Sequence, residues 1–336
     1  KAGEDYVVDV DRTGTSADRN PTITIIDKDT GTDQTNTQWV EALHQFLQLK
    51  HNCKLSVQSL KAVFISNVSY FKLYDKLYGL TGTLGLRGER KLLEEVYEAD
   101  FVILPTAKPK QFYQRLPIVL PGEEAWRKCI RERSEHHVLK QNRSVLVICD
   151  SVNDVEVLYQ TLRVNKRLKI HKYTREYEEF DVLQSQEELG PGHVIIATNL
   201  AGRGTDIKIN SGLKSKGGLH VILSYLPNNV RIEQQAFGRT ARCGDNGSGQ
   251  LIIKSEDVKP GASPIIHLKN QRDIKELERV SKMKVYYEKQ TSAEEECFSQ
   301  FKKQYNVLMN KIKSGVTDKE VQDTLLRSCI DKWAFW

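Results

Sequence analysis

Short apolar runs separated by amphipathic stretches dominate the middle of the chain. From FVILP at residues 101–105 to about residue 254, the runs VLVIC, LKIHKY, VIIAT, LHVIL and QLIIK begin at residues 145, 168, 194, 219 and 250. Runs without strict alternation suit strands that are buried on both faces of a sheet. The pattern predicts an α/β fold with a parallel sheet covered by helices, and FVILP is the first of its apolar runs.

One helix start between these runs is well marked. Ser151 followed by Asp154 is typical of a helix N-terminus directly after VLVICD. The periodicity that follows turns Val155, Leu158 and Leu162 inward.

The first hundred residues are less regular. Residues 6–10 and 22–26 are β-like, and residues 38–50 and 67–78 have helical patterns. Trp39 and His44 lie in the first of these helical patterns, where we expect them to pack in a core rather than to take part in chemistry.

Beyond about residue 260 charged helical patterns replace the strands. Ser292 and Glu295 have the spacing of a capping box, and an apolar stripe follows them. Trp333 and Trp336 close the chain, and we expect both indoles to be docked.

Composition narrows the class of protein. The chain has 336 residues, of which 39% are hydrophobic, so it can build about two domains with real cores. Its formal net charge of +6 is small, and positive and negative residues are mixed along the chain, which argues against a dedicated nucleic-acid-binding protein. The six scattered cysteines form no CxxC motif, so no metal site is expected, and they suit reduced thiols of a cytoplasmic protein.

Two segments carry the candidate chemistry. ATNLAGRGTDI, residues 197–207, places Gly202, Arg203, Gly204, Thr205 and Asp206 in one loop after a buried strand. Glycines let a backbone approach a phosphate, and an aspartate just beyond can accept hydrogen bonds from ribose hydroxyls. The loop taken alone is equally consistent with a tight strand-to-helix connection.

The second segment is RIEQQAFGRTARCGDNGSG at residues 231–249. Arg239 and Arg242 are three residues apart and would share one face if the segment were helical. The order Gln235-x-x-Gly238-Arg239-x-x-Arg242 matches the final signature of superfamily 2 helicase-type motors, whose arginines reach an ATP γ-phosphate. Salt bridges to surface carboxylates such as Glu233 or Asp245 are the alternative for such arginines.

These segments together resemble the second nucleotide-binding domain of the SecA family of preprotein-translocase motors. GGLHVI lies between them in the family order, and IIDKDTGTDQTNTQWVEALHQ, NVSYFKLYDKLYGLTGTLG and VILPTAKP resemble SecA segments that precede them. The resemblance covers about residues 22–254. LKNQRDIKELER and the closing WAFW are more similar to divergent SecA-like proteins of some eukaryotes.

The resemblance implies a role for each matched residue. Arg239 and Arg242 would be catalytic arginine fingers, and Thr81, Gly82 and Thr83 would couple the two motor domains. The implied nucleotide contacts are Gly202, Arg203, Gly204, Thr205, Asp206 and Gln235. The family has Arg-Gly where this chain has Phe237 and Gly238, and Ser-Gly where it has Thr240 and Ala241, so the arginine spacing is kept while its packing changes.

The implied fold is a RecA-like parallel-sheet domain of the superfamily 2 type. Residues 1–101 would be the C-terminal part of a first motor domain, residues 102–258 the second RecA-like domain, and residues 259–336 a helical appendage. The sequence has neither a GxxxxGK[ST] motif nor a DExD run. A near match to GxxxxGK[ST] at residues 212–219 has Gly218 in place of the lysine. We therefore expect the chain to start late in the first domain and to be inactive by itself.

The implied function is part of an ATP-driven protein-translocation motor. ATP would be bound with Mg²⁺ held by motifs of the missing first domain, which would be a partner together with a polypeptide substrate and a membrane translocase channel. Such a motor would be cytoplasmic or peripheral at a membrane. The alternatives are a fragment of a helicase-type RNA motor, with nucleic acid the less favoured partner, and a non-enzymatic interaction module that retains the fold.

Overall fold

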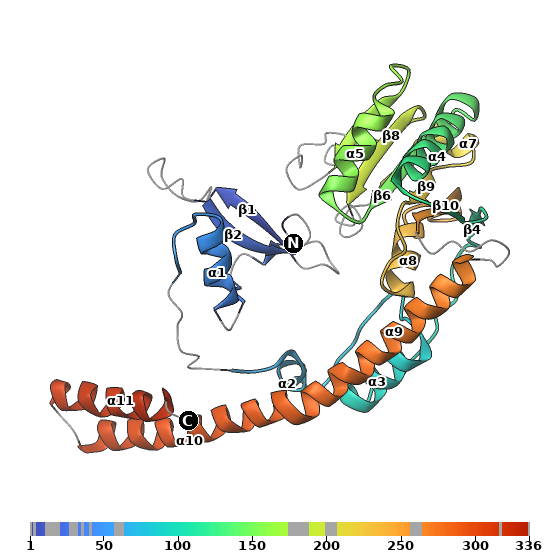
Figure 1. Ribbon diagram of the computed structural model, residues 1–336. Coiled ribbons are helices and arrows are strands. Elements are labelled where there is room, and N and C mark those ends of the chain that lie inside the picture. Colours follow the sequence, from blue (N-terminus) through green and yellow to red (C-terminus); the bar gives the residue numbers. More distant parts are fainter. Residues whose placement is uncertain are drawn as a thin grey trace. The chain divides into compact units, whose positions relative to one another are not determined.

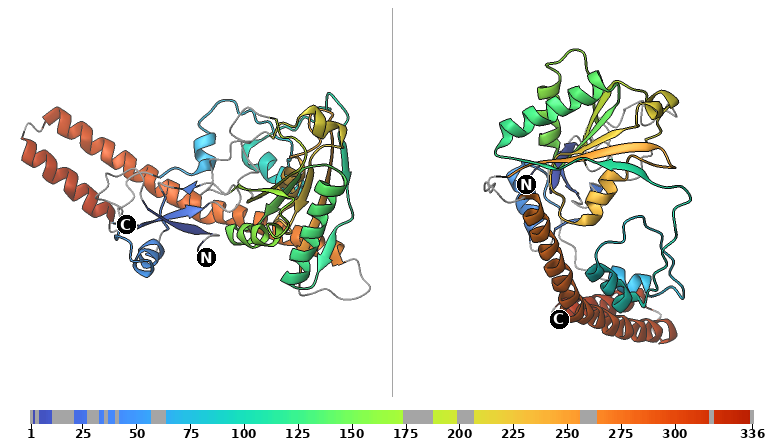
Figure 2. Two further views of the ribbon diagram at one scale, coloured as in Figure 1. Left: turned by 90° about the horizontal axis from the view of Figure 1, so that it is seen from above. Right: turned by 90° about the vertical axis from the view of Figure 1, so that its right-hand side faces the viewer.

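The computed structural model describes residues 2, 5–10, 21–26, 33–34, 37–39, 42–56, 64–173, 188–198, 207–255, 264–315 and 318–334. The chain divides into two compact units. Figure 1 and Figure 2 draw its helices and strands. The first comprises Lys1–Ser56, Gly82–Gly85 and Val102–Glu276, and the second comprises Val57–Thr81, Leu86–Phe101 and Leu277–Trp336.

A parallel sheet organises the first unit. Its strands among the described residues are β4 (Gln111–Gln114), β5 (Ile118–Leu120), β6 (Val145–Cys149), β7 (Lys169–Tyr173), β8 (His193–Thr198), β9 (His220–Leu223) and β10 (Asn246–Lys254). Their order is β4-β10-β9-β6-β8-β7, and β5 also pairs with β10. All of these pairings are parallel, so the predicted α/β fold of the RecA-like type is confirmed.

Helices cover both faces of this sheet, which explains the continuous apolar runs. The covering helices are α4 (Glu123–Glu135), extended by the π-helical turn η1 (His136–Lys140), α5 (Val152–Leu162), α7 (Ser211–Ser215) and α8 (Val230–Phe237). On β6, Val145, Val147 and Cys149 pack with α4 and α5, while Leu146 and Ile148 pack with α7 and α8. A strand buried on both sides has no position for a polar residue, so the run VLVIC needs no alternation.

The predicted start of α5 is confirmed. The Oγ atom of Ser151 accepts a hydrogen bond from the backbone N of Asp154 at 3.1 Å. Val155, Leu158 and Leu162 are the buried residues of this helix, as its periodicity predicts.

The N-terminal elements form a small antiparallel sheet with one helix. The strands are β1 (Tyr6–Val10), β2 (Pro21–Ile26) and β3 (Asp33–Gln34), and the helix is α1 (Leu43–Lys50). Trp39 packs against the small core of Tyr6, Ile23 and Cys53, and His44 is buried, which agrees with the packing role expected for both. The helix begins later than predicted, because Ala42 has a left-handed backbone with φ 59°.

Helices make up the described part of the second unit. They are α2 (Asn67–Phe71), α3 (Arg87–Tyr97), the later part of α9 (Pro264–Tyr286), the π-helical turn η4 (Tyr287–Thr291), α10 (Ser292–Gly315) and α11 (Lys319–Ala334). No described helix combines the length and apolar character that a membrane crossing requires.

The predicted capping box at Ser292 is wrong, because α9, η4 and α10 follow one another without a break. Ser292 Oγ donates instead to the carbonyl of Tyr287 at 3.0 Å. The carboxylate of Glu295 accepts from the backbone N of Ser66 at 2.9 Å and from the hydroxyl of Ser69 at 2.7 Å. Glu295 therefore helps to order the start of α2 rather than the start of its own helix.

The predicted docking of Trp333 is confirmed. Its ring stacks on Phe301 with centroids 4.6 Å apart and meets the edge of Phe298 at 5.0 Å. These contacts attach α11 to α10. Trp336 lies outside the described residues.

Two other sequence predictions are wrong. Val102, Ile103 and Leu104 of the FVILP run are exposed and belong to no strand, because no described segment pairs with them. The helix predicted over residues 67–78 stops at Phe71, and the next four residues form turns and a bend.

Candidate functional site

The predicted arginine motif lies at the end of α8 and in the turn that joins it to β10. Asn229 caps the helix, with its Oδ1 accepting from the backbone N of Ile232 at 3.0 Å. The helix ends at Phe237, before both arginines. The condition for Arg239 and Arg242 to share one helical face is therefore not met. Ala241 and Cys243 have left-handed φ values of 56° and 54°, which helical backbone does not allow.

Local hydrogen bonds fix this arginine turn, which we define as residues 239–245. Thr240 Oγ1 donates to the carbonyl of Leu219 at 2.8 Å, and Arg242 Nε donates to the carbonyl of Gly238 at 2.8 Å. The backbone N of Asp245 donates to the carbonyl of Arg242 at 2.9 Å. These bonds attach the turn to the residue before β9 and to the end of α8.

The turn lies beside the amino ends of β9 and β10. Leu219 directly precedes β9, and β10 begins directly after the turn. The arginine turn follows α8 and lies at the amino edge of the sheet, away from the carboxyl edge where open α/β sheets usually bind ligands. The reason is geometric, because α8 starts after the carboxyl end of β9 and returns the chain to the opposite edge.

The carboxylates proposed as surface partners of these arginines pair with other cations. Glu233 contacts Lys269 and Arg272, each at 2.5 Å, and Asp245 contacts Lys214 at 3.1 Å. The guanidinium of Arg239 is largely buried, with 7% of the residue exposed, and Arg242 is half-buried.

The predicted coupling segment meets the start of the arginine motif. Gln235 Nε2 donates to Thr83 Oγ1 at 3.1 Å, and both residues belong to the first unit. Gly82 and Thr81 are exposed, and Thr81 belongs to the second unit. Of the predicted residues, the structure thus brings together Gln235 and Thr83.

The position of the predicted nucleotide-contact loop is not described by the structure. Gly202, Arg203, Gly204, Thr205 and Asp206 lie outside the described residues. The loop follows β8. Beyond it, the backbone N of Leu189 donates to the carbonyl of Lys208 at 2.7 Å, and the backbone N of Asn210 donates to the carbonyl of Leu189 at 3.1 Å.

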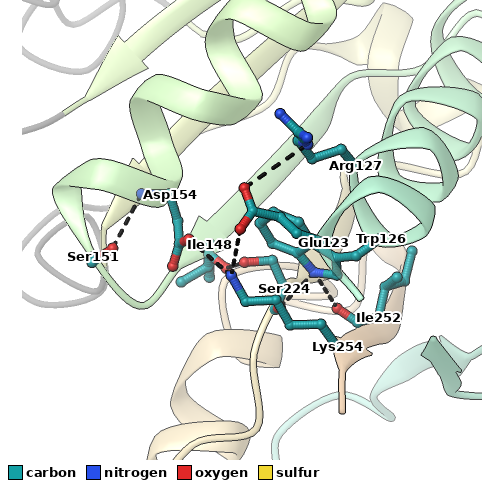
Figure 3. A network of polar contacts seen from close by, with 9 residues as sticks. All are labelled: Glu123, Trp126, Arg127, Ile148, Ser151, Asp154, Ser224, Ile252 and Lys254. Carbon is teal, nitrogen blue, oxygen red and sulfur yellow. Dashed lines mark hydrogen bonds and ion pairs between the residues drawn. The ribbon is translucent and has the colours of Figure 1, made fainter. Parts of the chain in front are cut away.

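A polar network absent from the sequence motifs ties together the carboxyl edge of the sheet (Figure 3). The indole Nε1 of Trp126 donates to the carbonyls of Ser224 and Ile252 at 2.9 and 3.2 Å. Lys254 lies 4.7 Å from the centroid of the Trp126 ring and 3.4 Å from a carboxylate oxygen of Asp154. Trp126 and Ile130 lie on the apolar face of α4, and their helical spacing is the sequence signal that could have identified Trp126 as a buried residue.

The carboxyl edge also holds two protonated groups. Burial raises the pKa of the Cys149 thiol and the pKa of the Tyr225 phenol, which nearby Asp150 raises further. Both groups remain neutral near pH 7, so Cys149 is not a thiolate nucleophile.

Comparison with known proteins identifies the family. The model of the helicase conserved C-terminal domain matches residues 128–244. Protein translocase subunit SecA of Desulfotalea psychrophila is 33% identical over 240 residues, which are 70% of this chain and 27% of that protein. The Campylobacter lari subunit is 32% identical over 239 residues, covering 71% and 27%.

Among solved structures, S. cerevisiae Dbp5 bound to RNA and ADP BeF3 is 19% identical, covers 59% of this chain and 46% of that chain, and has a TM-score of 0.38. The chain spans about a quarter of the length of the curated relatives that it matches. The arginine motif lies inside the segment matched by the domain model. This chain belongs to the SecA family, and its parallel-sheet unit contains the helicase conserved C-terminal domain.

Proposed function

We propose that this chain provides the second nucleotide-binding domain of a SecA-like, ATP-driven protein-translocation motor. In this role Arg239 and Arg242 contact the phosphates of ATP across a cleft, and the loop of Asp206 contacts the nucleotide. The observation that carries the proposal is the hydrogen bond of Gln235 to Thr83, because it joins the start of the arginine motif to the TGT segment.

The donor set of the motif fits a phosphate. Residues 235–242 include two guanidiniums and a glutamine amide but no carboxylate, so they can meet an anion and cannot hold a divalent cation. Mg²⁺ would be held by motifs of the first motor domain. When bound, ATP and Mg²⁺ would supply the phosphoryl group to be transferred and the charge that stabilises it.

The fixed arginine turn suits a contact made mainly in the transition state. The hydrogen bonds of Thr240 and Arg242 hold the turn before any ligand arrives. Preorganised charges require little rearrangement when negative charge develops on the transferring phosphoryl group. Arg242 would therefore act on turnover more than on nucleotide affinity.

The experiment replaces Arg242 by Ala in the full-length protein. ATP turnover should fall by about 10³-fold while nucleotide binding changes little. The matched control is Arg127→Ala, which removes an exposed arginine whose Glu123 partner is 3.9 Å away. Normal turnover by Arg242→Ala would exclude the proposed finger role.

The same assay tests the polypeptide partner. The proposal expects unfolded polypeptide to stimulate turnover, in line with the SecA relatives. The helicase conserved C-terminal domain is the observation that favours a helicase-type RNA motor as the second candidate. Stimulation by RNA and not by polypeptide would support that alternative.

A further inference from the structure

A groove of about 440 Å³ opens at the amino edge of the parallel sheet, within the first unit. We define it as the amino-edge groove, and its polar and glycine lining includes Lys110, Arg115, Arg143, Gly217, Gly247 and Ser248. Gly247 and Ser248 lie in β10, and Lys110 and Arg115 flank β4. The other two residues, Arg143 and Gly217, come from the segments before β6 and β9.

The fold positions one guanidinium rigidly in this groove. Arg143 is only 7% exposed, and its Nε and Nη2 atoms donate to the carbonyls of Gly218 and Gly217, each at 2.8 Å. These two bonds use one edge of the planar fork. The Nη1 end makes no hydrogen bond to any described residue and stays available to a ligand.

A second guanidinium adds to the positive charge. The Nε atom of Arg115 is buried and has no hydrogen-bond partner among the described residues. Burial, followed by the charge of Arg115, lowers the pKa of Arg143 to about 10. Two like charges placed together in a partly desolvated groove are costly unless an anion joins them.

No described carboxylate offsets this charge. Among the described residues, no ion pair involves Lys110, Arg115 or Arg143, and the Nζ atom of Lys110 instead lies 5.2 Å from the centroid of the Phe112 ring. The groups that shift the pKa of Arg143 include no acid. The described groove therefore has donors in excess of acceptors.

A hydroxyl completes the donor set. Ser248 Oγ lies 2.8 Å from Nδ1 of His220, which is fully buried and stacks on His137 with ring centroids 3.6 Å apart. When Nδ1 of the neutral imidazole carries its proton, it donates to Ser248 Oγ. The hydroxyl proton of Ser248 can then donate into the groove.

We propose that the amino-edge groove binds a small phosphate-bearing anion. Two guanidiniums, an ammonium and a hydroxyl provide more donors and more positive charge than a single carboxylate can use, whereas a phosphate dianion has enough oxygens and charge to match them. This site is separate in its residues from Arg239 and Arg242, and the inference does not depend on the proposed motor function.

Isothermal titration of the chain with inorganic phosphate and with phosphoserine, in a buffer free of phosphate and sulfate, tests the proposal. Wild-type protein should bind at least one of them, and the tighter ligand distinguishes a free phosphate from an esterified one. Arg115→Gln should weaken binding by about tenfold, because it removes a charged donor. Lys110→Gln, at an exposed position, tests the same charge if Arg115→Gln does not fold.

An arginine variant at the far edge of the sheet serves as the control. Arg167→Gln removes an exposed charge before the opposite edge strand β7 and should bind phosphate normally. Absence of wild-type binding at millimolar ligand would overturn the proposal. So would equal affinity in wild type, Arg115→Gln and Lys110→Gln, and a loss of binding confined to Arg242→Gln would assign the phosphate to the arginine motif instead.

Discussion

Gly247 allows β10 to pass directly beneath the arginine turn. A Cβ atom built at this position would lie 2.2 Å from Thr240 Oγ1 and 2.6 Å from the backbone N of Ala241. The second of these atoms is backbone and cannot rotate away. A glycine is therefore required here by close approach, and the position of Arg239 and Arg242 depends on it.

We predict that Gly247→Ala destabilises the chain by about 1–3 kcal/mol, because the added methyl group overpacks this contact. Urea unfolding followed by circular dichroism measures the loss. Gly315→Ala is the matched control, since nothing lies within 4 Å of its Cβ position and the residue ends α10. Equal stability of the two variants would show that the turn adjusts freely.

The buried imidazoles of His137 and His220 make stability depend on pH. Burial, reinforced by nearby Arg143 and Arg115, lowers the pKa of His137 to about 3. Burial likewise lowers the pKa of His220 to about 2, with further contributions from His137 and Arg143. An unfolded histidine binds its proton near pH 6.5, so the unfolded chain takes up protons that the folded chain refuses.

We therefore predict that the histidine contribution to the free energy of unfolding is fully present above about pH 6.5 and is lost as the pH falls towards 3. The loss should be about 1.4 kcal/mol per pH unit for each histidine. Urea unfolding at pH 7.5 and 5.5 measures it. His137→Phe keeps a stacking ring and removes one titrating group, so its stability should depend less on pH than that of wild type.

At the scale of elements, an ion-pair network joins α8 to the first part of α9. Glu233 on α8 is largely buried and contacts Lys269 and Arg272 on α9, and Arg272 also donates to Asp273 at 2.9 Å. The helix that precedes the arginine turn is thus attached to the helix that follows the sheet. A change at this contact should affect the placement of both helices.

We predict that Glu233→Gln costs about 3 kcal/mol of stability, because it leaves the buried Arg272 without its main counter-charge. Arg272 would still contact the carboxylate of Asp273, so the loss of stability should lie at the low end of the range for a broken buried ion pair. Thermal or urea unfolding measures the change. The double variant Glu233→Met with Arg272→Met should regain most of the stability, and failure to do so would mean that packing rather than charge explains the single variant.

At the scale of the whole molecule, the sequence contains the residues of only one side of the proposed nucleotide site. It contains Gln235, Arg239 and Arg242 but neither a phosphate-binding GxxxxGK[ST] loop nor a DExD run. Arginine fingers stabilise charge on a phosphate that other residues hold and align. In the proposed motor, turnover therefore needs the complementary motor domain.

We predict that the purified chain shows no Mg²⁺-dependent ATP hydrolysis above background, as measured by release of inorganic phosphate. Arg239→Ala is the control for a contaminating enzyme, whose activity would not respond to it. A wild-type rate that disappears in Arg239→Ala would contradict the prediction.

The sequence by itself determined the parallel sheet and the family. Runs such as VLVIC and VIIAT lack polar positions, and only strands covered on both faces can bury them completely. The helix start at Ser151 was predictable for a similar reason, because a cap depends on residues close in sequence. The apolar run FVILP does not form a strand, because a strand also needs a neighbouring strand to pair with, and the local pattern of the sequence cannot show whether one is present.

Only the tertiary structure decided where the candidate site residues lie. The spacing of Arg239 and Arg242 was visible, but their position at the amino edge follows from the direction of α8 and from the left-handed backbone of Ala241 and Cys243. The amino-edge groove gave no sequence signal, because residues as distant as Arg115 and Ser248 come together only when β4 pairs with β10. The local sequence pattern determines helices and strands, whereas the order in which the strands pair determines which charged side chains meet across the sheet.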